Sequence, residues 1–302
     1  MTETDPRRGL LLAAGSALLS ACFIIPWKIA TGYGKPEEAT LVLLVVAATL
    51  NSLTTVFSRR EAARTADRPL GPTLVLALAF GAISYAGNLF SAEAVLRLSG
   101  PVVAVLQRCE VLVVALLGWL LLGERVRANY WVGTAVAAVG LVILSQPATG
   151  ASATVSDTNL TGVLCGLGSA LCFGTMAVLT RKHIHAVRPL LLNALRLWCG
   201  VALWFAVEHR IPTRAELPNG LLVGAGLAGL FGPFLARLCL IYSTIYIRTS
   251  TSALIAIATP ALTLVLGFLV LGTVPSARAT LGGTIMLLGI AVPIVGMLRE
   301  HQ

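Results

Sequence analysis

Long apolar stretches separated by short polar breaks dominate the chain. Each stretch has about the 20 residues that an α-helix needs to cross a bilayer, and the breaks carry the Gly, Pro and clustered charges that are typical of turns. The pattern predicts an all-α membrane protein with ten transmembrane helices. The predicted spans are 9–30, 38–58, 72–92, 100–121, 128–146, 160–180, 189–208, 218–244, 250–271 and 278–298.

The two halves of the chain resemble each other. Laid over 250–296 with an offset of 149, the segment 99–144 shares several residues with it, and four of the shared residues are glycines (118, 123, 133 and 140). Gly-Ser-Ala-Leu at 15–18 recurs at 168–171. Self-similarity of this kind indicates a tandem duplication. We therefore predict a first repeat at 1–146, an extracytoplasmic linker at 147–159 and a second repeat at 160–302.

An odd number of spans in each repeat sets their relative orientation. After five crossings the second repeat must enter the membrane upside down relative to the first, so the predicted fold is two inverted five-helix repeats. Internal repeats of this type are a leading sign of a transporter. Two conformations that exchange the roles of the halves would open one central site to opposite sides.

Composition excludes a soluble protein. Apolar residues make up 57% of the chain and charged residues 12%, whereas soluble globular proteins carry about 25% charged residues. With the N-terminus in the cytoplasm, 13 Lys and Arg residues fall in cytoplasmic segments and five in outer ones. This bias predicts a multi-pass protein of the cell membrane with both termini cytoplasmic. It also accounts for most of the net charge of +9, which is therefore no argument for nucleic-acid binding.

Charged side chains inside spans are the first candidates for a site, because each costs about 2.5–3.5 kcal/mol to insert. Glu110 lies near the middle of the fourth span, and its repeat equivalent Thr259, followed by Pro260, puts a polar group and a helix break at the same depth. Glu110 suits a proton-coupling carboxylate, a ligand for a substrate ammonium group, or a structural ion pair. Arg108 lies about 200° away round the helix, so we expect it to point in a different direction.

Two further intramembrane arginines are candidates. Arg196 lies one turn from Asn193 in the seventh span, and it would bind a substrate anion or pair with Glu110. Arg237 follows Gly232 and Pro233, which are expected to loosen or break the eighth span near the cavity. Unwound backbone is tolerated there only if it lines a cavity or is buried in protein. Arg237 would line that cavity or extend toward the cytoplasm.

The remaining residues indicate no other chemistry. Tyr85 and Asn88 share one face of the third span and are further cavity candidates. No catalytic or nucleotide-binding motif is present, so we expect a protein that is not an enzyme and has no cofactor. The six cysteines lie in apolar segments without paired spacing, which favours packing over metal binding or disulfides. The segment ending at Cys22 resembles a lipoprotein signal peptide, but cleavage would remove the first helix of the bundle.

The junction between the fourth and fifth spans carries the most specific motif. Pro101 is followed by Leu-Leu-Gly-Glu-Arg at 121–125 and then by Gly133 and Gly140. In this motif and in its ten spans, the chain resembles the EamA-type transporters of the drug/metabolite transporter superfamily over nearly its whole length. That family usually repeats a Gly-Glu in the second half, where this chain has Gly-Thr at 272–273. The resemblance implies a secondary transporter, often an exporter of amino acids or related metabolites, with a cavity between the repeats.

Together these features predict a secondary active transporter that exports a small polar, amino-acid-like metabolite by alternating access. Its partners would be that substrate, the lipid bilayer and, through Glu110, protons. The excess of intramembrane Arg over Glu favours a rival function, an exchanger of phosphorylated or nucleotide-linked metabolites. A membrane-embedded enzyme or a scaffold fits less well, because no paired acid/base or metal-binding residues share one depth. Both a monomer and a homodimer are compatible with the sequence.

Overall fold

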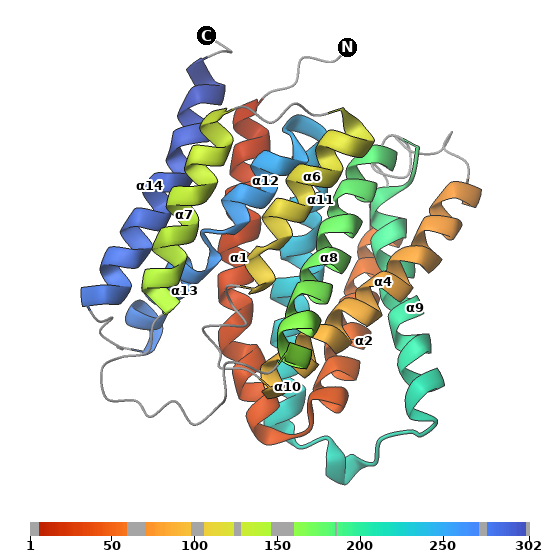
Figure 1. Cartoon of the computed structure of the whole chain (residues 1–302). Coiled ribbons are helices and arrows are strands. Elements are labelled where there is room, and N and C mark those ends of the chain that lie inside the picture. The colour runs from red at the N-terminus through yellow and green to blue at the C-terminus, as the bar shows by residue number, and fades with distance from the viewer. Residues whose placement is uncertain are drawn as a thin grey trace.

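Helices form nearly all of the described chain in the computed structural model (Figure 1). The structure describes residues 6–58, 70–97, 106–123, 128–145, 160–184, 186–271 and 277–299. No strand occurs within these ranges, in agreement with the all-α class. The predicted linker, and the motif residues Pro101, Glu124, Arg125, Gly272 and Thr273, lie outside them.

The helices follow the predicted spans closely. In the first half they are α1 (Pro6–Tyr33), α2 (Pro36–Phe57), α4 (Leu70–Arg97), α6 (Glu110–Leu122) and α7 (Ala128–Ser145). In the second half they are α8 (Leu160–His183), α9 (Pro189–Glu208), the one-turn η1 (Arg214–Glu216), α10 (Asn219–Gly229), the π-helical η2 (Leu230–Ala236), α11 (Arg237–Tyr246), α12 (Thr249–Ala256), α13 (Thr259–Leu271) and α14 (Ala277–Arg299). Six helical segments in the described ranges are long and apolar enough to cross a membrane.

Local sequence explains several helix ends. Pro36 and Pro189 begin α2 and α9, where the missing N–H of proline costs no helical hydrogen bond. Gly123 ends α6 with φ of 64°, a left-handed conformation that glycine adopts without a steric penalty. These residues place the helix starts and the helix end at the breaks that the polarity pattern indicates.

Helices of one repeat pack largely against helices of the other. α4 packs on α8 and α9, and its counterpart α10 packs on α1 and α2. α2 also packs on its own counterpart α9, and α7 packs on its counterpart α14. The halves therefore form one intertwined bundle. α1 begins and α14 ends at the same end of this bundle, here named the terminal end, and residues 209–218 lie at the opposite end (Figure 1).

Where α7 and α14 pack together, a glycine of each helix lies against the backbone of the other. A Cβ on Gly140 would lie 2.4 Å from the amide nitrogen of Met286, and a Cβ on Gly289 would lie 2.5 Å from that of Ala137. Gly289 and Met286 are the equivalents of Gly140 and Ala137 at the offset of 149. Glycine at both positions lets the two backbones touch, which is how apolar helices associate closely in lipid.

Candidate functional site

Each repeat contains a break in its fourth helix, at equivalent positions. In the first repeat the chain turns at Cys109, just before α6 begins. In the second it turns at Ile257 and Ala258, between α12 and α13. Cys109 and Ala258 are 149 residues apart, so the duplication has kept the break. Pro260 stands in the first turn of α13, where its missing N–H leaves no helical hydrogen bond unmade.

The two breaks contact each other through Arg108. Its Nη1 donates to the carbonyl oxygen of Ala256 at 3.2 Å, and the hydroxyl of Thr259 donates to the same oxygen at 2.8 Å. A break frees backbone carbonyls that a regular helix would pair. A side chain of the first repeat thus satisfies a carbonyl of the second.

The expectation that Arg108 and Glu110 point in different directions is wrong. Both line one pocket. The reason is the turn at Cys109, where the amides of Cys109 and Leu112 bond to carbonyls three residues back. Three residues per turn, instead of 3.6, reduce the angle between positions two residues apart. The angle of about 200° holds only for a regular helix, and the turn at Cys109 interrupts the helix here.

The pocket lies between α6, α8, α11 and α12, with an empty volume of about 500 Å³. Its charged part contains Glu110, Arg108 and Arg237, and the Glu110 carboxylate is attracted by both guanidinium groups. Toward the terminal end the lining consists of hydroxyl and small apolar side chains; the hydroxyl residues are Thr180, Thr244, Thr249 and Ser252. The pocket contains residues of both repeats.

Span eight widens where a break was expected. Gly232 and Pro233 lie within the π-helix η2, and the helix continues into α11. The widened turn leaves carbonyls free for other partners: Pro233 O accepts from Asn193 Nδ2 at 3.3 Å, and Ala236 O accepts from Ser16 at 2.9 Å. The prediction of a break is therefore corrected to a widening. It is followed directly by Arg237, which lines the pocket.

Arg196 and Asn193 form a buried polar network beside η2. Asn193 Oδ1 accepts from Nη2 of Arg196 at 2.8 Å, and Ser84 accepts from Nη1 at 2.8 Å. Asn193 also donates to Asn51 Oδ1 at 2.8 Å. Arg196 is 6% exposed and has no carboxylate within 4 Å among the described residues. The alternative that it pairs directly with Glu110 is therefore not what the structure contains.

The two candidates from the third span lie away from the pocket. Asn88 is exposed, and its amide donates to the Ser84 carbonyl of its own helix at 2.8 Å. Tyr85 packs on the apolar cluster of α1, α2, α9 and α10. Thr259 is buried and touches the site only through the shared carbonyl of Ala256. The spacing of Tyr85 and Asn88 identified a shared helix face, but it did not identify what that face contacts.

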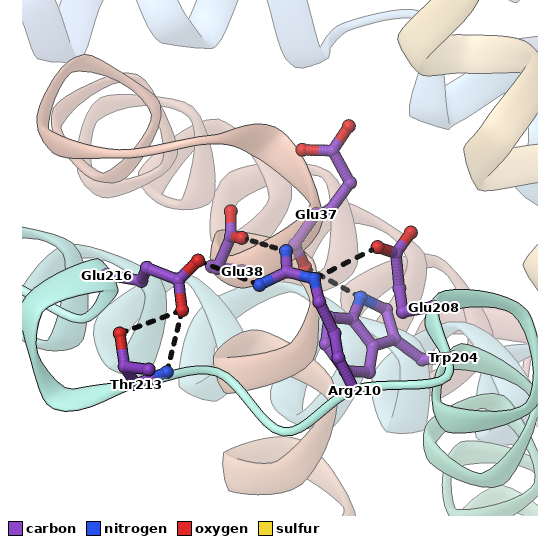
Figure 2. A network of polar contacts seen from close by, with 7 residues as sticks. All are labelled: Glu37, Glu38, Trp204, Glu208, Arg210, Thr213 and Glu216. Atoms are coloured by element: carbon purple, nitrogen blue, oxygen red, sulfur yellow. Dashed lines mark hydrogen bonds and ion pairs between the residues drawn. The ribbon is translucent and has the colours of Figure 1, made fainter.

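A second polar site lies at the opposite end and was not among the sequence candidates (Figure 2). Arg210, just after α9, contacts Glu38 of α2 and bonds to Glu216 at 2.8 Å and to Glu208 at 3.5 Å. Trp204 donates to the Glu37 carbonyl at 3.0 Å, and the guanidinium carbon of Arg210 lies 5.9 Å from its ring centre. These residues are named the Arg210 cluster below. In sequence they are ordinary loop and helix-end charges, far apart along the chain.

Hydrogen bonds favour the charged forms of Arg210 and Glu216 in the Arg210 cluster. The amide and hydroxyl of Thr213 donate to Glu216 at 2.7 and 2.9 Å, and together with Arg210 they hold the pKa of Glu216 below its ordinary value of 4.5. The bond to Glu38 raises the pKa of Arg210. Near neutral pH the Arg210 guanidinium and the Glu216 carboxylate are therefore both charged.

The described residues contain no group of three or more His, Cys, Asp or Glu side chains that could hold a metal ion. None of the six cysteines, all of which lie in the described ranges, forms a disulfide. The polar groups that meet inside the bundle are instead guanidinium, carboxylate, amide and hydroxyl groups. They can bind a charged or polar solute by hydrogen bonds and ion pairs.

Comparison with known proteins agrees with this architecture. The model of the EamA-like transporter family matches residues 7–146 and 160–294, and the chain belongs to that family. It is a multi-pass membrane transporter of the drug/metabolite transporter superfamily. A solved structure titled "Crystal structure of protein" is 16% identical, covers 97% of this chain and 99% of its own, and has a TM-score of 0.77; at that identity it supports the fold alone. A search of curated proteins found no match.

Proposed function

We propose that this chain is a secondary transporter of a small zwitterionic, amino-acid-like metabolite, which binds in the pocket where the two repeats meet. The observation that carries the proposal is the meeting of Glu110 with Arg108 and Arg237 beside the paired helix breaks. A carboxylate next to two guanidinium groups offers partners for both an ammonium group and a carboxylate.

The hydroxyl groups of the pocket suit a polar substrate tail. Thr180 and Thr244 donate to the carbonyls of Met176 and Ile241, at 2.6 and 2.7 Å. Their hydrogens are therefore committed, and their oxygens remain as acceptors. A substrate whose tail carries N–H or O–H groups would satisfy them better than a purely aliphatic one.

Glu110 is the residue that we assign to proton coupling and ammonium binding. A carboxylate can hold either a proton or a cation, so occupancy by one excludes the other. With a proton gradient directed into the cell, such competition would exchange an outgoing substrate for an incoming proton. Export in exchange for protons is thus the mechanism that we propose.

A second candidate is an exchanger of phosphorylated or nucleotide-linked metabolites. Three buried or pocket-lining arginines, Arg108, Arg196 and Arg237, stand against one intramembrane carboxylate, Glu110. This excess of positive charge favours a substrate with more than one negative charge. The two candidates differ in whether a phosphorylated solute competes for the site.

Transport in proteoliposomes tests both candidates. The purified chain would be reconstituted and supplied with a panel of labelled amino acids, sugar phosphates and nucleotide-linked sugars, with and without a pH gradient. Flux of amino acids that rises with the gradient supports the first candidate. Exchange of phosphorylated solutes without an effect of the gradient supports the second, and no flux of any solute contradicts both.

Replacing Arg196 by Ala is expected to weaken the binding of anionic substrates about tenfold, the effect of about 1.4 kcal/mol, because a buried positive charge beside the pocket attracts an anion. Arg196→Lys, which keeps the charge, should retain most of the affinity. The measurement is the half-saturation concentration in proteoliposomes. Unchanged affinity of Arg196→Ala for every transported anion would exclude Arg196 from anion binding.

A further inference from the structure

The Arg210 cluster joins the two repeats at the end of the bundle away from the pocket's hydroxyl lining. Glu38 belongs to the first turn of α2, in the first repeat, whereas Arg210, Glu208 and Glu216 belong to the second. Of the ion pairs between described residues, only Arg210 with Glu38 links the repeats. The bond from Trp204 to the Glu37 carbonyl crosses the same boundary.

Burial makes this link strong. The Glu38 side chain is 1% exposed, and its second carboxylate oxygen has no hydrogen-bond partner among the described residues. A buried carboxylate depends on its cation, because without it the charge would be left without compensation. Trp204, 2% exposed, covers the pair from the side of α9. The Arg210 side chain is 32% exposed, so the buried Glu38 carboxylate depends on a cation that itself reaches the surface.

Apolar packing closes the bundle directly behind the cluster. Side chains of α1, α2, α9 and α10 form one apolar cluster there, which includes Trp204 and Leu221. A Cβ on Gly224 of α10 would lie 2.8 Å from backbone atoms of Pro26 and Ala30 in α1. Helices of the two repeats are therefore in close contact at this end.

The pocket extends toward the other end. Thr180 lies in the last turn of α8, Thr244 in the last turn of α11, and Thr249 begins α12. All three helices reach the terminal end at these residues (Figure 1). The structure therefore combines a pocket toward the terminal end with a closed contact at the opposite end.

We propose that the Arg210–Glu38 pair is a gate, which closes the opposite end while the pocket faces the terminal end and must separate when the site turns to the other side. This inference rests on the alternating-access transport proposed above. Arg210 holds three carboxylates together, Glu38, Glu208 and Glu216. Without its charge they would repel one another and drive the repeats apart at this end.

Hydrogen exchange of the full chain in lipid nanodiscs tests the gate without depending on the substrate. In Arg210→Gln we expect amide exchange at least about tenfold faster in 36–41 and 219–225, with slower exchange in 249–253 at the terminal end. Opening at one end with closure at the other is the signature of a gate. Faster exchange confined to the loop 209–218 would overturn the proposal, because it would show local loosening alone.

Arg214 provides a matched control. It lies on the same loop, and its partners among the described residues belong to the second repeat, the Leu217 carbonyl and Asn219. Arg214→Gln should leave exchange at both ends as in the unaltered chain. If Arg214→Gln and Arg210→Gln behave alike, the gate assignment is wrong.

A double substitution tests the charge argument and also controls for misfolding. Glu38→Gln removes one of the carboxylates that Arg210 neutralises, so Arg210→Gln/Glu38→Gln should exchange more slowly at 36–41 than Arg210→Gln alone. Additive effects of the two substitutions would overturn the proposal. If these exchange results hold while the proteoliposomes transport nothing, the proposed substrate class fails and the gate remains.

Discussion

Glu110→Gln is expected to lower pH-driven net transport at least about tenfold, the effect of about 1.4 kcal/mol, while the protein remains folded. Glutamine keeps the shape of the side chain but cannot be ionised or take up a proton. Two guanidinium groups, those of Arg108 and Arg237, then lose their counter-charge in the pocket. The measurement is substrate flux in proteoliposomes with an imposed pH gradient, together with the melting temperature in detergent.

The matched control is Glu93→Gln. Glu93 pairs with Arg97 one turn away at 2.8 Å, and both side chains are more than 40% exposed, so its loss should leave flux unchanged. Substrate exchange without a gradient separates the two roles of Glu110: retained exchange indicates proton coupling alone, and lost exchange indicates substrate binding as well. Normal pH-driven flux in Glu110→Gln would remove this residue from the mechanism.

Gly140→Ala is expected to destabilise the protein by about 1–3 kcal/mol, the usual cost of overpacking. The added methyl group would lie 2.4 Å from the amide nitrogen of Met286 and 2.6 Å from the carbonyl oxygen of Gly282. Backbone atoms cannot rotate away as a side chain can, so α7 and α14 must separate. The melting temperature and the monodisperse fraction in detergent would report the loss.

Two further variants sharpen this prediction. Gly289→Ala should have a similar effect, since its Cβ would meet Ala137 as that of Gly140 meets Met286. Gly226→Ala on α10 is the control, because no atom lies within 4 Å of the added Cβ. If all three variants have the same melting temperature as the unaltered chain, the reciprocal contact of α7 and α14 does not stabilise the protein.

Much of the fold could be predicted from local sequence. The lengths of the apolar stretches set the spans, because a helix must cover the thickness of the bilayer. Repeated glycines at a fixed offset indicated the duplication, and the odd number of spans its inversion. Glu110, Arg108 and Arg237 were chosen for their cost in lipid, and they lie together in the pocket. Charge in an apolar segment is a signal that needs no knowledge of contacts.

Other features of the site could not be predicted from the pattern of a regular helix. The turn at Cys109 brings Arg108 and Glu110 into one pocket, although a regular helix would separate them. Arg196 is bonded to Asn193 and Ser84 and makes no ion pair with Glu110. Asn88 satisfies its amide within its own helix. Of these, the bond from Arg196 to Ser84 joins two helices, and the others are local choices among partners that a regular helical pattern does not distinguish.

The sequence by itself determined that this chain is a duplicated, inverted bundle of membrane helices, because span length, span number and the glycine repeat can be found by comparing stretches of sequence without knowledge of any contact. The tertiary structure alone decided which polar groups meet. Arg210 and Glu38 are 172 residues apart, and Arg108 and Ala256 are 148 apart. Each pair is brought together by the crossing of the two repeats, and the site and the proposed gate both lie at such crossings.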